Sequence, residues 1–480
     1  MKELVRTQMV LGEIDPRFIL IDPRNRDELT HVLLGLQAIY TDDESRIAVL
    51  ECLSKILPTY TRGKTGRPGL SLWECFVLAV VRLTCNLDYD MLKSFADNHR
   101  LLRAILGIGW SNEKREFPLQ TIRDNLYNLT DEILAELNVL IVKHGHRILG
   151  LDGELEARGD SFVVLSNVHY PTDINLLLDA MRKSLFLIGR ACSQAGVNGW
   201  RKFSFNYEKV RKLYRHTQKL KESKAKDEAR RLVKEAAIRA AHGEYIDMCR
   251  DLLDRVVASV EELKQVGYVA ELDEIRHFVS CGRNLIDQIH RRCLNGETIP
   301  HSEKMFSLFE EYTEWISKGK AGVRQELGLN VCIVSDQHGF ILHHRVMRRE
   351  VDADVAVPLI KDTVQHFALN SISFDKGFHS AENQKELGKL VKHVVVPKKG
   401  KLSQSRHAEE HEPEFIRRRH AHSAVESTIH GLDSGGLDRC LDRTEKGFYR
   451  YVAIGIVARN LKTLGAAIRR SKISDEEAAA

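Results

Sequence analysis

The feature that most constrains the fold of this chain is a long helical interruption between two sets of strand-like segments. Four consecutive apolar residues, Phe162–Leu165, have the pattern of a strand that is buried on both faces. From about residue 174 to 320 the pattern is almost wholly helical, and strand-like segments return only at 328–347. If these strands share one sheet, that sheet carries a large helical insertion after its first strand.

Strand and helix patterns alternate in the second half of the chain. Residues 328–347 predict a hairpin that turns at Asp336–Gly339, where Gly339 suits a positive φ. The pattern then predicts, in order, a helix at 353–368, a strand that ends at Asp375, a helix at 380–390, a strand at 392–399, a polar basic loop and a helix at 422–432. We therefore predict an α/β fold, with a mixed sheet and helices on both of its faces.

The first 150 residues have only helical patterns. Ser71 is placed to cap a helix, and two short amphipathic segments follow within 71–105. Such a pair can form a helix-turn-helix, and any small helical bundle has the same pattern. Further along, Thr172 or Asp173 can cap the helix that starts at 174, and capping is the role we expect for Asp173.

Length and composition favour a cytoplasmic protein of two to four domains, because 480 residues suffice for several hydrophobic cores. No apolar stretch approaches the ~18 residues of a membrane span, and the first residues include acids and a proline where a signal peptide has an apolar block. Nine cysteines are scattered without a CxxC pair, which predicts reduced thiols and no zinc knuckle. We expect no association with a membrane.

The positive charge of the chain is concentrated in residues 201–240, which contain fourteen Lys or Arg and five Asp or Glu. The segment lacks Pro and Gly and is rich in helix formers, so we predict one long helix. Such charge either forms a solvated face or attracts a polyanion through its phosphates. The candidate DNA contacts in this segment are Arg211, Lys212, Arg215 and Lys219.

Three acids occupy positions where an α/β sheet can bring them together. Asp160 opens the first strand, Asp375 ends a later one, and Glu426 lies on the helix after the last strand. Open α/β sheets place ligand chemistry at the carboxyl ends of their strands. Carboxylate oxygens are suitable ligands for Mg²⁺ or Mn²⁺. Two such ions can activate the attacking oxygen and the leaving oxygen when a phosphodiester bond is broken. The alternative is that Asp375 only ends a strand and Glu426 is a surface acid.

Other charged residues near these acids have competing interpretations. Asp152 is a rival first acid, but it precedes the strand. Three consecutive arginines, 417–419, come before the helix of Glu426 and either contact a DNA backbone or lie in solvent. The segment 407–411, HAEEH, fits an inverted zincin pattern, but its surroundings are polar and basic and we do not expect zinc there.

Several long motifs resemble a known family of transposases. They are "GRPGLSLWECFVLAVVRL", "GDSFVVLSNVHYPTDINLLLDA", "GLNVCIVSDQHGFILHHRVM", "SFDKGFHSAENQ", "VVVPKKGKLS", "HSAVESTIHGLDSGGLDRC" and "GFYRYVAIGIVARNL". In this order they resemble the insertion-sequence transposases grouped as ISNCY, within the wider DDE class. The resemblance covers about residues 60–465.

The resemblance implies an RNase H-like catalytic domain that uses two Mg²⁺ or Mn²⁺ ions to cleave DNA and transfer strands. The three catalytic and metal-binding acids it implies are Asp160, Asp375 and Glu426. Some cut-and-paste relatives surround the glutamate with a Tyr, Arg, Glu, Lys pattern. The corresponding positions here read Arg419, His422, Glu426 and Asp433, which argues against that subgroup.

These inferences define the expected organisation. We expect a helical DNA-binding domain at 1–150, a catalytic domain at 151–175 and 325–465, an all-α insertion at 176–324, and a disordered tail at 466–480. The expected partners are double-stranded DNA and at least one further copy of the chain, because two transposon ends must be paired. Two alternatives remain open: a transposase-derived DNA-binding protein without cleavage activity, and an RNase H-like nuclease or resolvase.

Overall fold

The structure is a computed structural model that describes residues 11–57, 69–221, 227–317 and 325–479. It divides into two compact units, one formed by Met1–Asn167 with Glu314–Ala480 and the other by Val168–Thr313. The described residues form a mostly helical α/β protein with a six-stranded mixed sheet, as the alternating pattern predicted. The sheet lies in the first unit, and the second unit is the helical insertion.

The sheet has the order β2-β3-β1-β5-β6, with β4 also paired to β3. The strands β2, β3 and β4 continue the sheet from β1 in antiparallel steps, whereas β1, β5 and β6 are parallel. The mixed directions follow from the connections, since a hairpin joins β3 to β4 and helices join the parallel strands. The bounds are β1 (Leu155–Leu165), β2 (Glu314–Ser317), β3 (Gln325–Ser335), β4 (Ile341–Val346), β5 (Leu369–Phe374) and β6 (His393–Val395).

The β3–β4 hairpin turns where the sequence predicted. Gly339 has φ +86°, a left-handed conformation that glycine adopts without strain. Asp336 is fully buried, and its carboxylate accepts hydrogen bonds from the backbone N–H groups of His338 and Phe340, both at 2.9 Å. His146 lies 2.7 Å from the other oxygen, so the turn is tied to the helix that carries this histidine.

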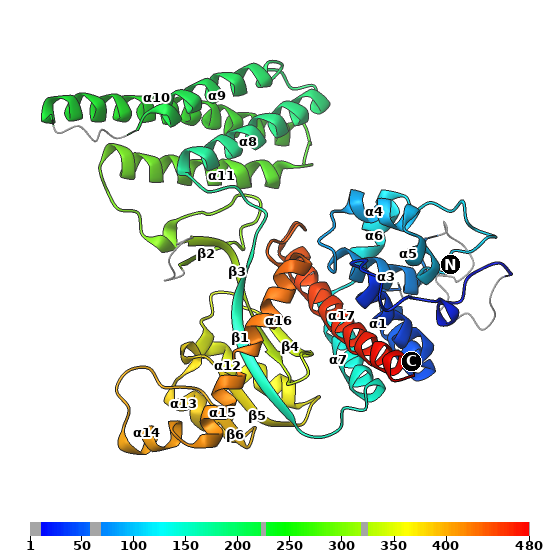
Figure 1. Ribbon diagram of the computed structural model, residues 1–480. Helices are drawn as coiled ribbons and strands as arrows, with labels where there is room; N and C mark the ends of the chain where they lie inside the picture. The colour runs from blue at the N-terminus through cyan, green and yellow to red at the C-terminus, as the bar shows by residue number, and fades with distance from the viewer. Residues whose placement is uncertain (1–10, 58–68, 222–226, 318–324, 480) are drawn as a thin grey trace. The chain divides into compact units, whose positions relative to one another are not determined.

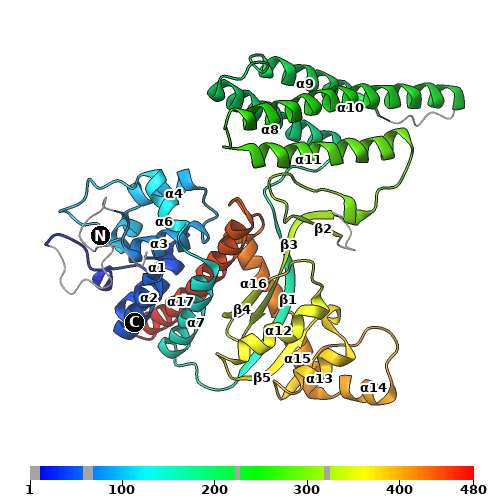
Figure 2. The same cartoon turned by 180° about the vertical axis from the view of Figure 1, so that it is seen from behind.

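Helices cover both faces of the sheet. Figure 1 shows α15 and α16 in front of β1 and β5, and Figure 2, from behind, shows α12 and α13 on the opposite face. Side chains alternate along β1, so Glu156 and Asp160 face α15 and α16, whereas Ser161 faces the start of α12. The bounds are α12 (Asp352–Val364), α13 (Ala381–Leu387), α14 (Gln404–Glu410), α15 (Pro413–Ala421) and α16 (Ala424–Leu432).

The N-terminal helices pack around the C-terminal helix α17 (Glu445–Ala479), which contacts both α1 and α7. Ser71 caps α3 through a capping box with Glu74, as predicted. By length and composition α17 could cross a membrane, but 67% of its most apolar window is buried inside the structure, as in the core helix of a soluble protein. The bounds are α1 (Thr30–Thr41), α2 (Asp43–Ser54), α3 (Leu72–Arg82), α4 (Tyr89–Asn98), α5 (Arg100–Ile105), α6 (Leu119–Leu126) and α7 (Asp131–Ile148).

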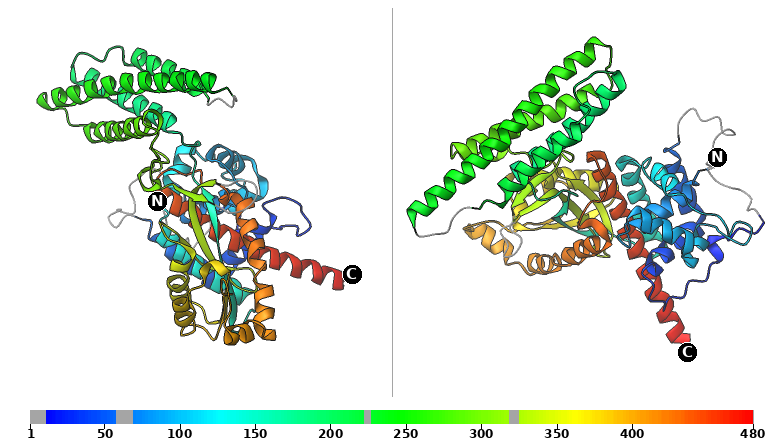
Figure 3. Two further views of the ribbon diagram at one scale, coloured as in Figure 1. Left: turned by 90° about the vertical axis from the view of Figure 1, so that its left-hand side faces the viewer. Right: turned by 90° about the horizontal axis from the view of Figure 1, so that it is seen from above.

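The described residues of the helical unit form four long helices around an apolar core of their own. Its buried Trp200 donates a hydrogen bond to Ser259 at 2.8 Å. Figure 3 shows the start of α10 projecting beyond the other three helices, and residues 228–237 of this projection are almost all exposed. The bounds are α8 (Asp173–Ala195), α9 (Phe203–Lys219), α10 (Glu228–Gln265) and α11 (Leu272–Ile289).

Several local predictions differ from the structure. Asp160 lies in the middle of β1 and does not open it, because the strand begins at Leu155. Thr172, not Asp173, caps α8; Asp173 is the first helical residue and lies 3.1 Å from Arg292. The basic segment 201–240 forms two helices, α9 and α10, rather than one.

Two further segments are more ordered than the pattern suggested. The basic loop expected before the Glu426 helix contains α14 and α15. The segment 466–479, expected as a disordered tail, continues α17. Short 3-10 and π-helical turns complete the described chain: η1 (Pro16–Phe18), η2 (His290–Leu294), η3 (His301–Glu303), η4 (Lys376–Phe378) and η5 (Asp433–Leu437).

Candidate active site

Strand register brings Asp160 and Asp375 together. Gly159 of β1 pairs in parallel with Phe374, the last residue of β5, so the two aspartates are the next residues on neighbouring strands, about 4.8 Å apart in backbone spacing. A Cβ atom on Gly159 would lie 2.1 Å from the Phe374 ring. Glycine is therefore required there for the two strands to keep this register.

Glu426 joins the pair from α16, above the same face of β1. The preceding helix α15 is held to that face because Arg417 donates to Glu156 at 2.6 Å and Arg418 lies 3.5 Å from the same carboxylate. Because α16 follows α15 and packs on β1, its first turn carries Glu426 toward Asp160. The structure thus brings together all three acids predicted from the sequence.

Burial and the neighbouring acids both affect the ionisation of Asp160. Burial raises the pKa of its carboxyl to about 6, and the negative charges of Asp375, Asp352 and Glu426 act in the same direction. A hydrogen bond of 2.8 Å from the Ser161 N–H opposes them by favouring the carboxylate. The fold therefore places one carboxylate where two others and Asp352 repel it, which is typical of functional sites.

Asp352 is a fourth acid at this edge, and sequence reasoning missed it. The Ser161 hydroxyl donates to its carboxylate at 2.7 Å, and a Cβ atom on Gly377 would lie 2.8 Å from its other oxygen. It is the first residue of α12. The available signal was an acid at the start of a predicted helix, which usually serves only to stabilise the helix terminus.

His422 lies on the Asp375 side of the cluster. Its Nδ1 is 3.2 Å from the Ser373 hydroxyl, two residues before Asp375. Burial lowers the pKa of this imidazole, while the charges of Asp375 and Glu426 raise it. Because the pKa of His422 is lowered from its usual value, its ring is neutral at pH 7. A neutral imidazole can donate one hydrogen bond and accept another.

The donor set matches hard divalent cations in kind. Asp375 and Glu426 are exposed, and neither forms an ion pair with any residue that the structure describes. Carboxylates that repel one another and lack cationic partners are suited to binding Mg²⁺ or Mn²⁺. Within the described ranges, however, no three His, Cys, Asp or Glu side chains are already arranged to hold one ion together.

The three arginines before α16 are not equivalent. The Arg418 side chain is only 8% exposed and pairs with Glu414 at 2.8 Å, and Arg417 contacts the same glutamate. Arg419 is exposed and has no ion pair among the described residues. Contact with DNA remains a prediction for all three, and Arg419 is the best placed of them.

The basic residues of the helical unit form an exposed stripe on α9. Lys212, Arg215 and Lys219 are exposed at helical spacing, whereas Arg211 is half-buried and pairs with Glu208 at 3.0 Å. Leu213 and Thr217, on the other face, pack toward the core of the unit. The geometry fits either a solvated face or a polyanion-binding surface.

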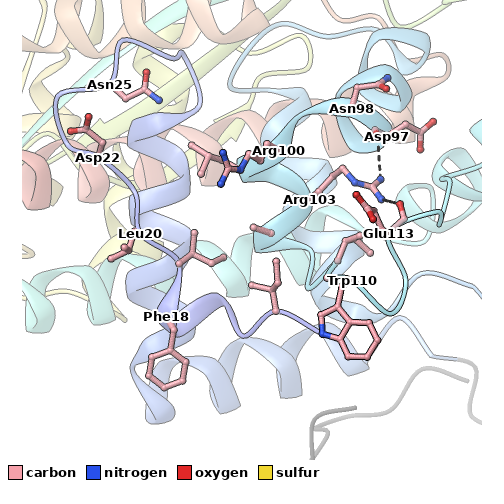
Figure 4. A pocket seen from close by; sticks show the side chains of 16 residues that line it. Phe18, Leu20, Asp22, Asn25, Asp97, Asn98, Arg100, Arg103, Trp110 and Glu113 are labelled. Atoms are coloured by element: carbon pink, nitrogen blue, oxygen red, sulfur yellow. Dashed lines mark hydrogen bonds between the residues drawn. The ribbon is translucent and has the colours of Figure 1, made fainter. Parts of the chain in front are cut away.

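Figure 4 shows an open groove of about 1090 Å³ between the N-terminal segment and α5. Phe18, Leu20 and Trp110 line it and are 79%, 94% and 74% exposed. Arg103 also lines it, but its guanidinium is occupied by the backbone carbonyls of Asp97 and Glu113. The lining of this groove is mixed, with apolar side chains beside three acids and two arginines, and it does not have the charge of a DNA-binding surface.

The HAEEH segment is not arranged as a metal site. The rings of His407 and His411 stack with their centroids 3.9 Å apart. The Glu410 carboxylate accepts a hydrogen bond of 2.9 Å from the Lys398 N–H and also pairs with Arg406. These residues form the C-terminal end of α14 instead.

Comparison of the chain with protein-family models, with curated proteins and with solved structures found no match. The acidic cluster therefore stands on its own geometry as the candidate active site of an α/β protein.

Proposed function

We propose that this protein is a DDE-type DNA transposase whose sheet belongs to an RNase H-like catalytic domain. The observation that carries the proposal is the convergence of Asp160, Asp375 and Glu426 from two parallel strands and a covering helix. The resemblance of the sequence motifs implies the same three acids. An RNase H-like fold is further supported by the mixed sheet, in which an antiparallel hairpin continues into parallel strands with helices on both faces.

The chain's own residues have distinct roles in this proposal. Asp160, Asp375 and Glu426 would hold two Mg²⁺ or Mn²⁺ ions, which supply activation of the attacking and leaving oxygens when bound. Ser161 fixes the Asp160 carboxylate through its N–H, and Gly159 keeps the two aspartates in register. His422 is held beside Asp375 by the contact between its Nδ1 and the Ser373 hydroxyl.

The remaining expectations belong to the same proposal. The basic stripe of α9 and Arg419 would contact the DNA backbone, the helices of residues 1–150 would recognise the transposon ends, and two or more copies would pair those ends in the cytoplasm. A nuclease or resolvase with the same acids is the second candidate function. It would cleave without joining the released end to a target, so strand transfer distinguishes the two.

The decisive experiment compares DNA cleavage with DNA binding. In Mg²⁺, Asp375→Asn and Glu426→Gln should lower nicking of a duplex that carries the DNA flanking the coding sequence by several orders of magnitude. Affinity for the same duplex should change by only a few-fold, because the strand end and its surroundings are retained. The control is Asp152→Asn, since Asp152 is exposed and precedes β1. Near wild-type nicking by Asp375→Asn would falsify the assignment.

A further inference from the structure

A cationic cavity lies directly beside the acidic cluster. Its volume is about 410 Å³, and Lys376, the residue after Asp375, forms part of its wall. The rest of the wall comes from the segment after β6, the end of α14 and α15. The other lining residues are Lys398, Gly400, Leu402, Glu410, His411, Ile416, Arg419 and His420.

The charge of this cavity is positive. Lys376, Lys398 and Arg419 line it, and in the described parts of the chain none of their side chains forms an ion pair. Its single carboxylate, Glu410, is already engaged by Arg406 at 2.9 Å and by the Lys398 N–H. Three cationic groups without internal partners favour an anion such as a phosphate.

The same cavity also offers surfaces for a flat ring. Leu402 and the 37%-exposed Ile416 supply apolar contacts. His411 adds an imidazole whose orientation is held by a contact of 2.7 Å between its Nδ1 and the His407 carbonyl and by stacking on His407. Cations together with apolar and aromatic faces are the combination that binds single-stranded nucleic acid.

We propose that this cavity holds one unpaired nucleotide of a DNA strand next to the phosphodiester at the acidic cluster. A volume of about 410 Å³ accommodates a base with its phosphate. The neighbouring acids repel DNA, so a cationic anchor one residue away would hold the strand at the reactive position. The inference rests on the proposed function, because it assumes that the acids act on DNA.

The test measures strand binding by the full-length protein in EDTA, where metal-dependent cleavage does not occur. The probe is fluorescein-labelled dT12, followed by anisotropy. Lys398→Gln and Arg419→Gln should each weaken binding several-fold and make the slope of log K against log salt shallower by about 0.7. Lys389→Gln is the matched control, because Lys389 pairs with Glu386 and does not line the cavity.

A second arm tests the base. Wild-type protein should prefer dT12 to a 12-unit abasic strand by about fivefold or more, since each stacked base contributes substantially. Ile416→Ala should reduce that preference while keeping the salt slope. The proposal is overturned if Lys398→Gln and Arg419→Gln bind dT12 as the control does, or if wild type binds both strands equally.

The outcome is separable from that of the cleavage experiment. If Asp375→Asn still nicks DNA while the cavity variants lose dT12 binding, the acids are misassigned and the strand site stands. If nicking depends on Asp375 while the cavity variants bind dT12 normally, the acids are correctly assigned and the strand site is wrong.

Discussion

The ionised carboxylate of Asp160 lowers the stability of the metal-free fold, yet the proposed chemistry requires it. The residue is partly buried, and the charges of Asp375, Asp352 and Glu426 add to the effect of burial on its ionisation. A purely structural residue at this position would be neutral. Retaining a carboxylate is understandable if a cation neutralises it when the protein functions.

We therefore expect Asp160→Asn to stabilise the metal-free protein. A carboxyl pKa of about 6, raised from 3.8, disfavours folding once the group is ionised, by at most about 3 kcal/mol. The penalty is complete above pH 6 and absent below pH 4, where both folded and unfolded chains bind the proton. Asparagine keeps an oxygen for the Ser161 N–H. Thermal unfolding in EDTA should thus give a higher Tm for the variant at pH 8 and an equal Tm near pH 4.

A lower Tm for Asp160→Asn at pH 8 would contradict this account. Asp152→Asn serves as control, because that residue is exposed and its substitution should leave the Tm unchanged at both pH values.

Sequence reasoning found some site residues and missed others for identifiable reasons. Asp375 was predictable because the end of a buried strand is visible in the apolar pattern. The order of strands and helices also pointed to Asp160 and Glu426, and the motifs implied the same acids. Asp352 was not predictable, since its place at the site depends on how the first turn of α12 meets Ser161 across the sheet. Such a contact leaves no local pattern.

At the scale of elements, the sequence predicted those with strong apolar patterns. The β3–β4 hairpin and the end of β5 are confirmed. The short helices α14 and α15 were missed because they are polar and depend on tertiary contacts. One of these is the Arg406 guanidinium, which donates to the Val396 carbonyl at 2.6 Å and so ties α14 to the segment after β6. The break between α9 and α10 was missed because no Gly or Pro marks it.

The contact between α1 and α17 depends on two glycines. A Cβ atom on Gly465 would lie 1.7 Å from the His31 carbonyl oxygen, and one on Gly35 would lie 2.2 Å from the Leu461 carbonyl oxygen. Both obstacles are backbone atoms, which cannot rotate away. The helices therefore approach so closely only because both positions lack a side chain.

Gly465→Ala should destabilise the protein by about 3 kcal/mol, because α1 and α17 must separate to admit the methyl group. Chemical denaturation measures the change in the free energy of unfolding. Gly243→Ala is the opposite case: this glycine is inside α10 with nothing within 4 Å of the added atom, so alanine should stabilise by about 0.5–1 kcal/mol. If both substitutions have the same sign, the packing of α1 against α17 is not as described.

At the scale of the whole molecule, the two units differ in how the chain forms them. The first unit is built from two separate segments of the sequence, and the second from one continuous segment. The helices before residue 150 pack on α17 from the other end of the chain, and Arg82 of α3 pairs with the buried Asp442 at 2.8 Å. A fragment that ends near 150 therefore lacks the partners of its core. Residues 168–313, in contrast, are contiguous and surround their own apolar core.

We expect a fragment of residues 168–313 to fold alone and to carry part of the DNA affinity. Circular dichroism should show a cooperative helical unfolding transition, whereas a fragment of residues 1–150 should show none. The folded fragment should bind random duplex, because the α9 stripe faces solvent. Changing Lys212, Arg215 and Lys219 together to Gln should make the slope of log K against log salt shallower by up to about 2.7, at about 0.9 for each phosphate contact. A triple variant of Lys234, Arg250 and Arg276, elsewhere on the same unit, is the charge-matched control. If both triple variants change the slope equally, the effect is one of net charge and the stripe is only a solvated face.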